Sequence, residues 1–266
     1  MSGFSVDWLD LREPADFAAR NKELAAALVD YLQADADISP IIVDLGSGTG
    51  STLRALTRLG AHRCVWRLVD NDPALLNEAL RRHGQAEIVE DYQADLQDID
   101  ALPLGGAALL SASALFDLAS ADLIDALIAR LRKQPTVFYA ALNYDGRTEW
   151  TPTHPLDQAV LDAFNQDQRR DKGMGSALGP DAASYLQTAL QSAGYRVEMR
   201  ASPWLLGCEQ QALMEDLIHG IRAAVTDGDS LSGAELDDWQ AFRLAHVATG
   251  HALIGHIDVL AFPALE

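Results

Sequence analysis

Three groups of residues in this 266-residue chain have types and spacings that suit chemistry, and the clearest is a run of alternating glycines. The run reads Val43-Asp-Leu-Gly-Ser-Gly-Thr-Gly50, with glycines at positions 46, 48 and 50. Glycine lets the backbone approach a ligand closely and leaves N–H groups free to point at it. The run therefore predicts a ligand-binding loop, with a plain strand-to-helix bend as the simpler alternative.

Four polar residues later in the chain could contact a substrate or remove a proton from it. Asp117, Asn143 and Tyr144 each follow a short apolar run, and His154 lies in a polar stretch. Carboxylates and imidazoles in such places can act as general bases. The simpler alternatives are a helix cap or a surface carboxylate for Asp117 and a solvated loop position for His154.

The third group is a basic cluster in an otherwise acidic chain. Arg169, Arg170 and Lys172 lie close together, and Arg147 precedes them in the same half of the chain. One hypothesis is that these cations clamp a carboxylate or phosphate of the substrate, since guanidinium groups recognise both. The alternative is a solvated helix end whose charges are neutralised by neighbouring aspartates.

The elements that must position these residues alternate along the first half of the chain. A helix is expected over residues 14–32, where apolar residues recur at helical spacing. Beyond it, short apolar strands alternate with helices, and that alternation is typical of an open, mostly parallel α/β sheet. The expected strands are 41–45, 65–70, 87–90, 107–111 and 136–142, and the expected helices are 51–60, 73–82 and 120–132. In such a sheet the glycine run lies at the carboxyl ends of the strands, where ligands bind.

In the second half of the chain the alternation of strands and helices is interrupted. A polar loop and an amphipathic helix are expected after residue 143, and the α/β pattern returns later. The later elements are helix 181–193, strand 195–199, helices 208–226 and 233–248, and a last strand near 253–262. With no linker visible, we expect a single domain over residues 1–266. Its expected parts are an N-terminal helical cap (1–40) and two insertions (144–180 and 208–248) that cover the site.

The spacing of the glycines narrows the choice of ligand. A dinucleotide fingerprint would place its third glycine at position 51, where this chain has Ser51, so a nicotinamide-dependent oxidoreductase is disfavoured. A lysine that would complete a phosphate-binding loop is absent as well. Asp70 ends the second expected strand, twenty residues after Gly50, where a carboxylate can accept both hydroxyls of a ribose.

Together with Asp44, the glycine run resembles motif I of the class I S-adenosylmethionine (SAM) dependent methyltransferases. The similarity continues with Asp70, with Gln93-Ala-Asp-Leu96 after the third strand and with Ser111-Ala-Ser113 at the end of the fourth. It covers residues 41–142 and, more weakly, the sheet order as far as residue 262. The opening residues and the segment 143–180 also resemble a bacterial branch of this family to which no substrate can be attached.

This resemblance implies a Rossmann-like seven-stranded, mostly parallel sheet whose last strand is antiparallel, with flanking helices and helical insertions roofing the active site. It implies SAM as cofactor and S-adenosyl-L-homocysteine (SAH) as product. Asp44 would help to hold the methionine ammonium, Asp70 the ribose and Asp95 the adenine amino group, and either Arg12 or Arg20 could meet the methionine carboxylate. The expected cofactor residues are Arg20, Asp44, Gly46, Ser47, Gly48, Gly50, Asp70, Asn71, Asp95, Leu96 and Ser111.

Composition limits the partners. The chain has 39 Asp and Glu against 20 Lys and Arg, a formal net charge of −19, which argues against nucleic acids and anionic membranes. An apolar run long enough to span a bilayer and a signal peptide are both missing from the sequence, so a cytoplasmic location is expected. The histidines lack metal-ligand spacing, so no metal is expected.

We therefore expect a monomeric or homodimeric methyltransferase acting on a small molecule, anionic if the basic cluster is a clamp. Asp117, His154, Asn143 and Tyr144 are the candidates for the catalytic side. Methyl transfer needs mainly alignment, so a general base is optional. Two alternatives remain open at this point: a SAM-binding regulatory protein without turnover, and a protein methyltransferase.

Overall fold

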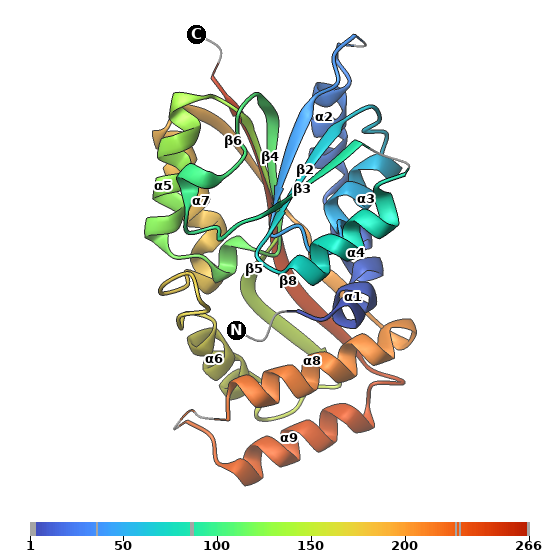
Figure 1. Cartoon of the computed structure of the whole chain (residues 1–266). Helices are drawn as coiled ribbons and strands as arrows, with labels where there is room; N and C mark the ends of the chain where they lie inside the picture. Colours follow the sequence, from blue (N-terminus) through green and yellow to red (C-terminus); the bar gives the residue numbers. More distant parts are fainter. Residues whose placement is uncertain (1–3, 36, 86–87, 227, 229, 265–266) are drawn as a thin grey trace.

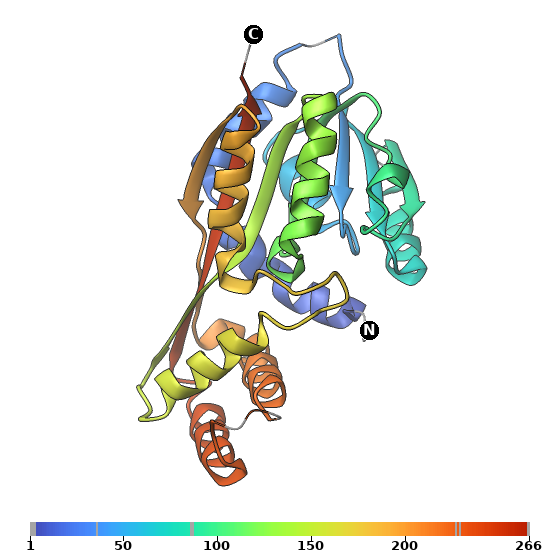
Figure 2. The ribbon, with the colours of Figure 1, turned by 90° about the vertical axis from the view of Figure 1, so that its left-hand side faces the viewer.

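A mixed sheet with helices on both faces forms the body of the protein (Figures 1 and 2). The computed structural model describes residues 4–35, 37–85, 88–226, 228 and 230–264. Among these residues the sheet has eight strands, in the order β3-β2-β1-β4-β5-β8-β6, with β7 paired to β8. The strands are β1 (Ile41–Leu45), β2 (Val65–Asp70), β3 (Ile88–Gln93), β4 (Ala107–Ser113), β5 (Val137–Thr151), β6 (Tyr195–Ala201), β7 (Trp204–Leu206) and β8 (His251–Pro263).

Strand directions follow the expected Rossmann-like pattern. β1 pairs in parallel with β2 and β4, and the parallel pairing extends to β3 and β5. β8 runs antiparallel between β5 and β6. The fold class expected from the sequence is therefore confirmed, with the short strand β7 as an addition to the seven strands of the main sheet.

Helices cover the two faces of the sheet separately. The helices are α1 (Val6–Ala19), α2 (Lys22–Leu32), α3 (Ser51–Arg58), α4 (Pro73–His83), α5 (Ala121–Lys133), α6 (Asp157–Asp167), α7 (Ala182–Ser192), α8 (Gln211–Ala224) and α9 (Gly233–Ala245). α5 and α7 pack on one face and α2, α3 and α4 on the other. Short 3₁₀ turns lie at η1 (Ile99–Ala101), η2 (Phe116–Leu118), η3 (Gly179–Asp181) and η4 (Cys208–Gln210).

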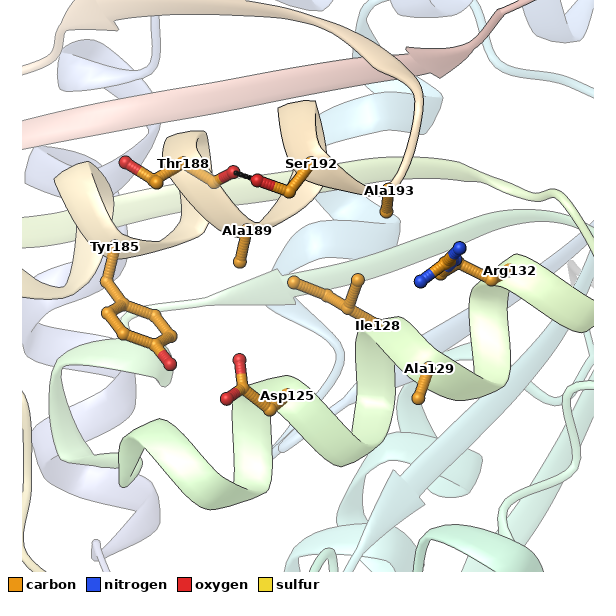
Figure 3. A pocket seen from close by; sticks show the side chains of 9 residues that line it. All are labelled: Asp125, Ile128, Ala129, Arg132, Tyr185, Thr188, Ala189, Ser192 and Ala193. Atoms are coloured by element: carbon orange, nitrogen blue, oxygen red, sulfur yellow. Dashed lines mark hydrogen bonds between the residues drawn. The ribbon is translucent and has the colours of Figure 1, made fainter.

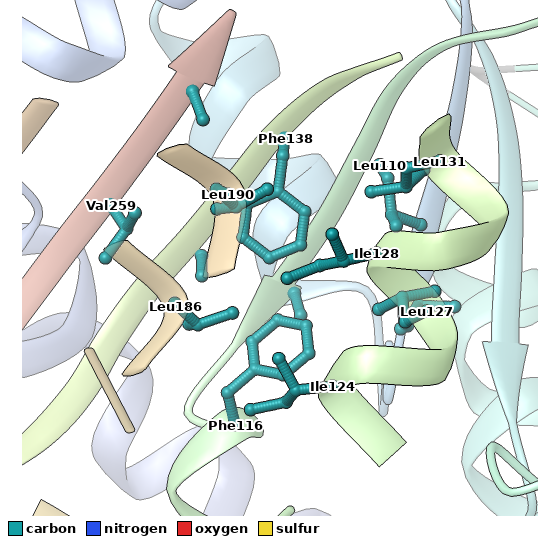
Figure 4. Packing of buried hydrophobic residues seen from close by; sticks show 14 of the residues in the cluster. Leu110, Phe116, Ile124, Leu127, Ile128, Leu131, Phe138, Leu186, Leu190 and Val259 are labelled. Carbon is teal, nitrogen blue, oxygen red and sulfur yellow. The ribbon is translucent and has the colours of Figure 1, made fainter. Parts of the chain in front are cut away.

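The core explains why the central strands are apolar at nearly every position. Ile42 and Val43 point to opposite faces of the sheet and are both fully buried, because helices cover both faces. Beneath α5 and α7, Phe138 packs against Phe116 with ring centroids 5.4 Å apart (Figure 4). Burial on both sides fixes β1 and β4, and these strands position the glycine run at their carboxyl ends.

The single helix expected over residues 14–32 is wrong. The segment forms two helices, α1 and α2, separated at Arg20 and Asn21. Asn21 is the N-cap of α2, since its side chain accepts hydrogen bonds from the backbone N–H groups of Glu23 and Leu24. Pro14 lies inside α1 and not at its first turn. The break matters for the site because it lets α2 pack on the sheet while α1 turns away from it.

The polar loop expected directly after residue 143 is also wrong. β5 continues to Thr151 and stays paired with β8, through Tyr144↔His256 and on to Thr151↔His251. The two long strands leave the main sheet and, with β7, carry α6, α8 and α9 beyond its carboxyl edge (Figure 2).

The third strand and the membrane expectation can also be compared with the sequence. Of the strand expected over residues 87–90, residue 87 lies outside the described part of the chain, and the described strand is Ile88–Gln93. The described helices include none that is both long and apolar enough to cross a membrane.

Candidate functional site

The glycine run forms a tight turn between β1 and α3, fastened by the carboxylate of Asp70. Gly46, Gly48 and Gly50 all have positive φ angles, +60°, +54° and +85°. The backbone N–H of Gly48 donates to Oδ2 of Asp70 at 2.9 Å, and Oδ1 of Asp70 accepts from the N–H of Asp72 at 3.0 Å. Asp70 at the end of β2 thus fixes the shape of the loop at the end of β1.

Helix α1 lies beyond the carboxyl ends of the strands (Figure 1), and its side chains face this loop across a small cavity. A cavity of about 40 Å³ remains between them, lined on one side by Leu9, Arg12 and Asp16 of α1. Two ion pairs hold the helix down: Arg54 of α3 with Glu13, and Arg82 of α4 with Asp10. We call this pair of contacts the α1 clasp. The loop-side lining of the cavity consists of Gly46, Ser47, Gly48, Thr49, Ser51 and Ser113.

Buried polar atoms without a partner surround the loop. The guanidinium of Arg20 is 4% exposed; its Nη2 donates to Ser113 Oγ at 3.0 Å, while its Nε and Nη1 bond to nothing in the described part of the chain. Asp44 Oδ2 and Ser47 Oγ are unpartnered in the same way. Buried polar groups are nearly always hydrogen-bonded, so a cluster of unpaired ones indicates a ligand site.

Asp44 is the carboxylate directly behind the loop. Its Oδ1 accepts from Ser111 Oγ at 2.6 Å. Burial raises the pKa of Asp44 to about 6, although the Ser111 hydroxyl and the charge of Arg20 act in the opposite direction. Ser111 therefore supports Asp44, and the residue of this strand that lines the cavity is Ser113.

The positive charge of Arg20 is compensated by the carboxylate of Asp258 on β8. The carboxylate of Asp258 is fully buried and accepts from the N–H groups of Asn21 and Leu142, at 2.9 and 2.8 Å, and from the Tyr139 hydroxyl at 3.3 Å. The charge of Asp258 acts on Arg20. This carboxylate anchors the break between α1 and α2 and so fixes the position of Arg20.

Asp117 lies on η2 and is buried, with 9% of its surface exposed and no partner for Oδ1 among the described residues. Burial raises its pKa to about 6, against its own backbone hydrogen bond and the charge of Arg12. It neither caps a helix nor lies on the surface, so both simpler interpretations of Asp117 are wrong.

Tyr144 and His256 face each other across β5 and β8. Their rings are 6.3 Å apart, and the His256 ring is 5.1 Å from that of Trp204 on β7. His256 is 6% exposed, and its Nδ1 is unpartnered within the described chain. Burial, together with the charge of Arg12, lowers the pKa of His256 to about 3. The sequence analysis missed His256, because only the long pairing of β5 with β8 brings it beside Tyr144.

Asn143 has a structural position. It is fully buried, and its Nδ2 donates to the carbonyl groups of Ala140 and Ile257 at 3.0 and 2.9 Å. These bonds satisfy backbone groups where the register of β5 and β8 shifts, between Ala140 and Asn143. Asn143 thus shapes the strand that carries Tyr144.

The other predicted residues are not gathered at the loop. His154 contacts α9, with Nε2 3.3 Å from Asp238 and its ring 4.8 Å from that of Phe242. Asn71 and Asp95 are exposed at the carboxyl ends of β2 and β3, and Asp95 accepts from the N–H of Gln97 in a local turn. Leu96, the neighbour of Asp95, is partly buried.

The cations of the basic cluster are paired, and its two arginines are exposed. Arg169 binds Asp181, and Arg170 and Lys172 both bind Asp167. Arg147 is also exposed, and its guanidinium lies 3.9 Å from the carboxylate of Glu149. These contacts favour the solvated alternative. The aspartate that neutralises Arg169 is Asp181, and not one of its neighbours in the sequence.

A larger hollow lies away from the loop. The groove between α5 and α7 measures about 340 Å³ and is floored by short side chains such as Ala129 and Ala189 (Figure 3). Two of its polar members, Asp125 and Tyr185, bond to each other. Unlike the loop, the groove carries none of the buried unpartnered polar atoms found in the described residues. No group of three potential metal ligands occurs in the described residues either, at the groove or elsewhere.

Solved methyltransferase structures resemble this chain. A SAM-dependent methyltransferase from Geobacter sulfurreducens in complex with SAH is 15% identical, with 99% of this chain and 100% of that one covered and a TM-score of 0.49. One from Thiobacillus denitrificans, also with SAH, is 16% identical, with 97% and 98% covered and a TM-score of 0.48. Geranyl diphosphate methyltransferase with GPP and sinefungin is 12% identical, with 91% and 78% covered and a TM-score of 0.46. No protein-family model and no curated protein matches the sequence.

The order and direction of the strands decide the fold. The sheet β3-β2-β1-β4-β5-β8-β6 has one antiparallel strand, the last, placed next to β5. The chain has the class I methyltransferase fold. In this fold the loop after β1 lies at the ligand edge of the sheet, where the unpartnered atoms of Arg20, Asp44 and Ser47 also lie.

Proposed function

We propose that the protein is a SAM-dependent methyltransferase acting on a small molecule. The observation that carries the proposal is the set of buried, unpartnered polar atoms around the glycine loop: a cation (Arg20), a carboxylate (Asp44) and a hydroxyl (Ser47). The amino-acid end of SAM has a carboxylate and an ammonium, which complement this set in charge. A simple strand-to-helix bend would leave these atoms without explanation.

The residue types around the loop suit the groups that the cofactor carries. Arg20 would hold the methionine carboxylate and Asp44 the ammonium, while the open backbone at Gly46 and Gly48 admits the ligand closely. Asp70 keeps the loop in shape and retains acceptor capacity for a ribose hydroxyl. Asp95 and Leu96 would meet the adenine, with Asn71 beside them at the end of β2.

SAM supplies an electrophilic methyl group, and the protein's contribution is to align it with the acceptor and to exclude water. The cavity of about 40 Å³ is far smaller than the roughly 300 Å³ or more of a ligand pocket. Helix α1 must therefore move away from the loop to admit the cofactor, which requires the α1 clasp, Arg54–Glu13 and Arg82–Asp10, to open.

A small acceptor suits the surroundings of the loop. Helix α1 covers the loop, and the arm formed by β5 and β8 carries α6 and α8 beyond the same edge of the sheet. We propose that α1, within the N-terminal segment 1–40, and the segments 144–180 and 208–248 together enclose the acceptor. Because the cations of the basic cluster are paired and its two arginines are exposed, we do not assign it to the acceptor.

Two measurements test the proposal. Titration calorimetry is expected to show binding of SAM and SAH by the purified protein. Incubation with methyl-tritiated SAM and a cell extract is expected to label a low-molecular-mass product. Label in the protein fraction would indicate a protein methyltransferase, and SAM binding without any label would indicate a regulatory protein. If neither SAM nor SAH binds, the proposal is wrong.

Replacing Asp70 by alanine is expected to weaken SAM binding about ten- to a hundredfold. The change removes the acceptor of the Gly48 N–H and a charge-assisted bond to the ribose, and such bonds contribute roughly 1.5–3 kcal/mol. Calorimetry measures the effect. Asp72→Ala is the matched control, because Asp72 caps α4 through the N–H of Ala74 and should affect stability more than affinity. A larger loss of affinity in the control would contradict the assignment of Asp70.

A further inference from the structure

A buried cluster of aromatic and polar side chains adjoins the cofactor cavity. It consists of Tyr144 on β5, Trp204 on β7 and His256 on β8, with ring centroids 5.1–6.3 Å apart along the chain of contacts. Tyr144 is also within electrostatic reach of Asp117. The three rings and the carboxylate come from four elements that pack on one another, with β7 also against α1, so the cluster is built by the fold and not by any local motif.

Arg12 joins this cluster to the cofactor cavity. It lines the cavity, and its guanidinium lies 5.1 Å above the Trp204 ring. Its charge acts on both Asp117 and His256. It is bound through two nitrogens by Asp16, whose Oδ1 also accepts from the Trp204 indole N–H. The charge of Arg12 is thus already balanced within α1.

Two polar atoms of the cluster are buried without a partner in the described chain: Oδ1 of Asp117 and Nδ1 of His256. Both residues are more than nine-tenths buried. An unpaired buried polar atom costs free energy, so two of them within the electrostatic range of the same guanidinium indicate a second ligand beside the cofactor.

We propose that Asp117 and His256 form the acceptor site, and that the acceptor is an uncharged, flat molecule with a hydroxyl or ring N–H that becomes methylated. The proposal rests on the proposed function and names its substrate class. Tyr144 and Trp204 would pack on the faces of the acceptor. Asp117 would accept its proton, and His256 would bind a second polar atom.

A bond forms between the acceptor oxygen or nitrogen and the methyl carbon while the carbon–sulfur bond of the sulfonium breaks, leaving its electron pair on sulfur. The acceptor's proton moves to the Asp117 carboxylate, which becomes a neutral acid. The positive charge of the sulfonium and the negative charge of Asp117 disappear together, so a closed site favours the step.

The charges of the cluster select against ionised acceptors. An anion would meet the Asp117 carboxylate and find Arg12 already bound to Asp16. A protonated amine has no lone pair with which to attack the methyl carbon, so a cationic acceptor does not react in that form. The exposed cations Arg169 and Arg170 are on the protein surface and paired with aspartates, so they offer an anion no alternative in this cluster.

The ionisable groups around Asp117 define its pH behaviour. Arg12 on α1 and Tyr144 on β5 face it. The other elements packed on η2 are η3 and α7, whose Asp181 and Tyr185 bind Arg169 and Asp125 instead. Since burial raises the pKa of Asp117 to about 6, we expect kcat/KM to rise through that pH as the carboxylate ionises.

The test uses the intact protein, methyl-tritiated SAM and a metabolite extract, with labelled products separated by ion exchange at pH 7. The label is expected in the uncharged fraction. Asp117→Asn should lower its rate of formation about 10²- to 10⁴-fold and remove the rise near pH 6, with SAM affinity unchanged. His256→Phe should raise the extract concentration needed for half-maximal rate about tenfold. Asp122→Asn and His251→Phe, at exposed positions, are the matched controls.

A second readout does not depend on turnover. Because the pKa of Asp117 is raised by folding, its stabilising effect is present below its ordinary pKa of 3.8 and is lost as pH rises through about 6. Asp117→Asn should therefore unfold roughly 5 °C above the wild type at pH 7.5, with the gap closing near pH 4. Equal unfolding temperatures at pH 7.5 would overturn the buried carboxylate as the base.

The remaining outcomes separate this inference from the proposed function. A labelled anionic or cationic product, or normal turnover in Asp117→Asn, overturns the inference and leaves the proposed function standing. SAM binding without any labelled product overturns the inference together with methyl transfer. Failure of SAM to bind overturns the proposed function itself.

Discussion

Replacing Gly48 by valine is expected to abolish SAM binding in a protein that still folds. Gly48 has a φ of +54°, and an added Cβ would lie 3.1 Å from Leu9 Cδ1 on α1. A β-branched residue at this φ costs about 1–3 kcal/mol of backbone strain, and its methyl groups would fill the space between the loop and α1. We expect calorimetry to show a loss of affinity of at least about 100-fold.

The matched control for this variant is Gly105→Val. Gly105 lies before β4 with an ordinary φ, and nothing lies within 4 Å of an added Cβ. Circular dichroism should show both variants folded, and the control should bind SAM like the wild type. Unchanged affinity in Gly48→Val would mean that the ligand binds elsewhere.

Replacing Asp258 by alanine is expected to lower the free energy of unfolding by about 3–5 kcal/mol, the typical effect of leaving a buried charge without compensation. The change leaves Arg20 without its buried counter-charge and removes the acceptor of the Asn21 and Leu142 N–H groups. The unfolding midpoint should fall by roughly 10 °C, measured by calorimetry or circular dichroism.

Asp238→Ala serves as the comparison, since Asp238 is a largely exposed carboxylate paired with His154. Its effect should stay within about 0.5 kcal/mol, because exposed ion pairs contribute little. If the two variants unfold at the same temperature, Asp258 does not anchor Arg20, and the position of that guanidinium must be fixed by other contacts.

The parts of the fold that the sequence predicted correctly are those set by local pattern. The apolar run before Gly46, the helix that begins at Pro73 and the strand that ends at Asp70 each carry their signal within a few residues. The Rossmann-like alternation followed from these segments. The geometry of the glycine loop was predictable for the same reason, because positive φ angles select glycine.

The errors came from long-range structure. Residues 144–151 are polar enough to suggest a loop, but pairing with β8, more than a hundred residues away, holds them in a strand. The same register brings His256 beside Tyr144, so no local signal marks His256. The break at Asn21 is a local capping signal that the helical spacing of its apolar neighbours concealed. Propensity and periodicity are overridden where tertiary pairing decides.

Helix α1 covers the glycine loop and also carries Arg12 into the aromatic cluster. This arrangement sets the order in which ligands bind and leave. Because one helix covers both ligand sites, the acceptor cannot enter once the helix has closed. The cofactor must therefore already be in place when the acceptor enters. We expect compulsory-order kinetics, with SAM adding first and SAH leaving last. SAH should then inhibit competitively against SAM and non-competitively against the acceptor. When release of SAH limits the rate, moderate salt should accelerate turnover by screening the ion pairs Arg54–Glu13 and Arg82–Asp10.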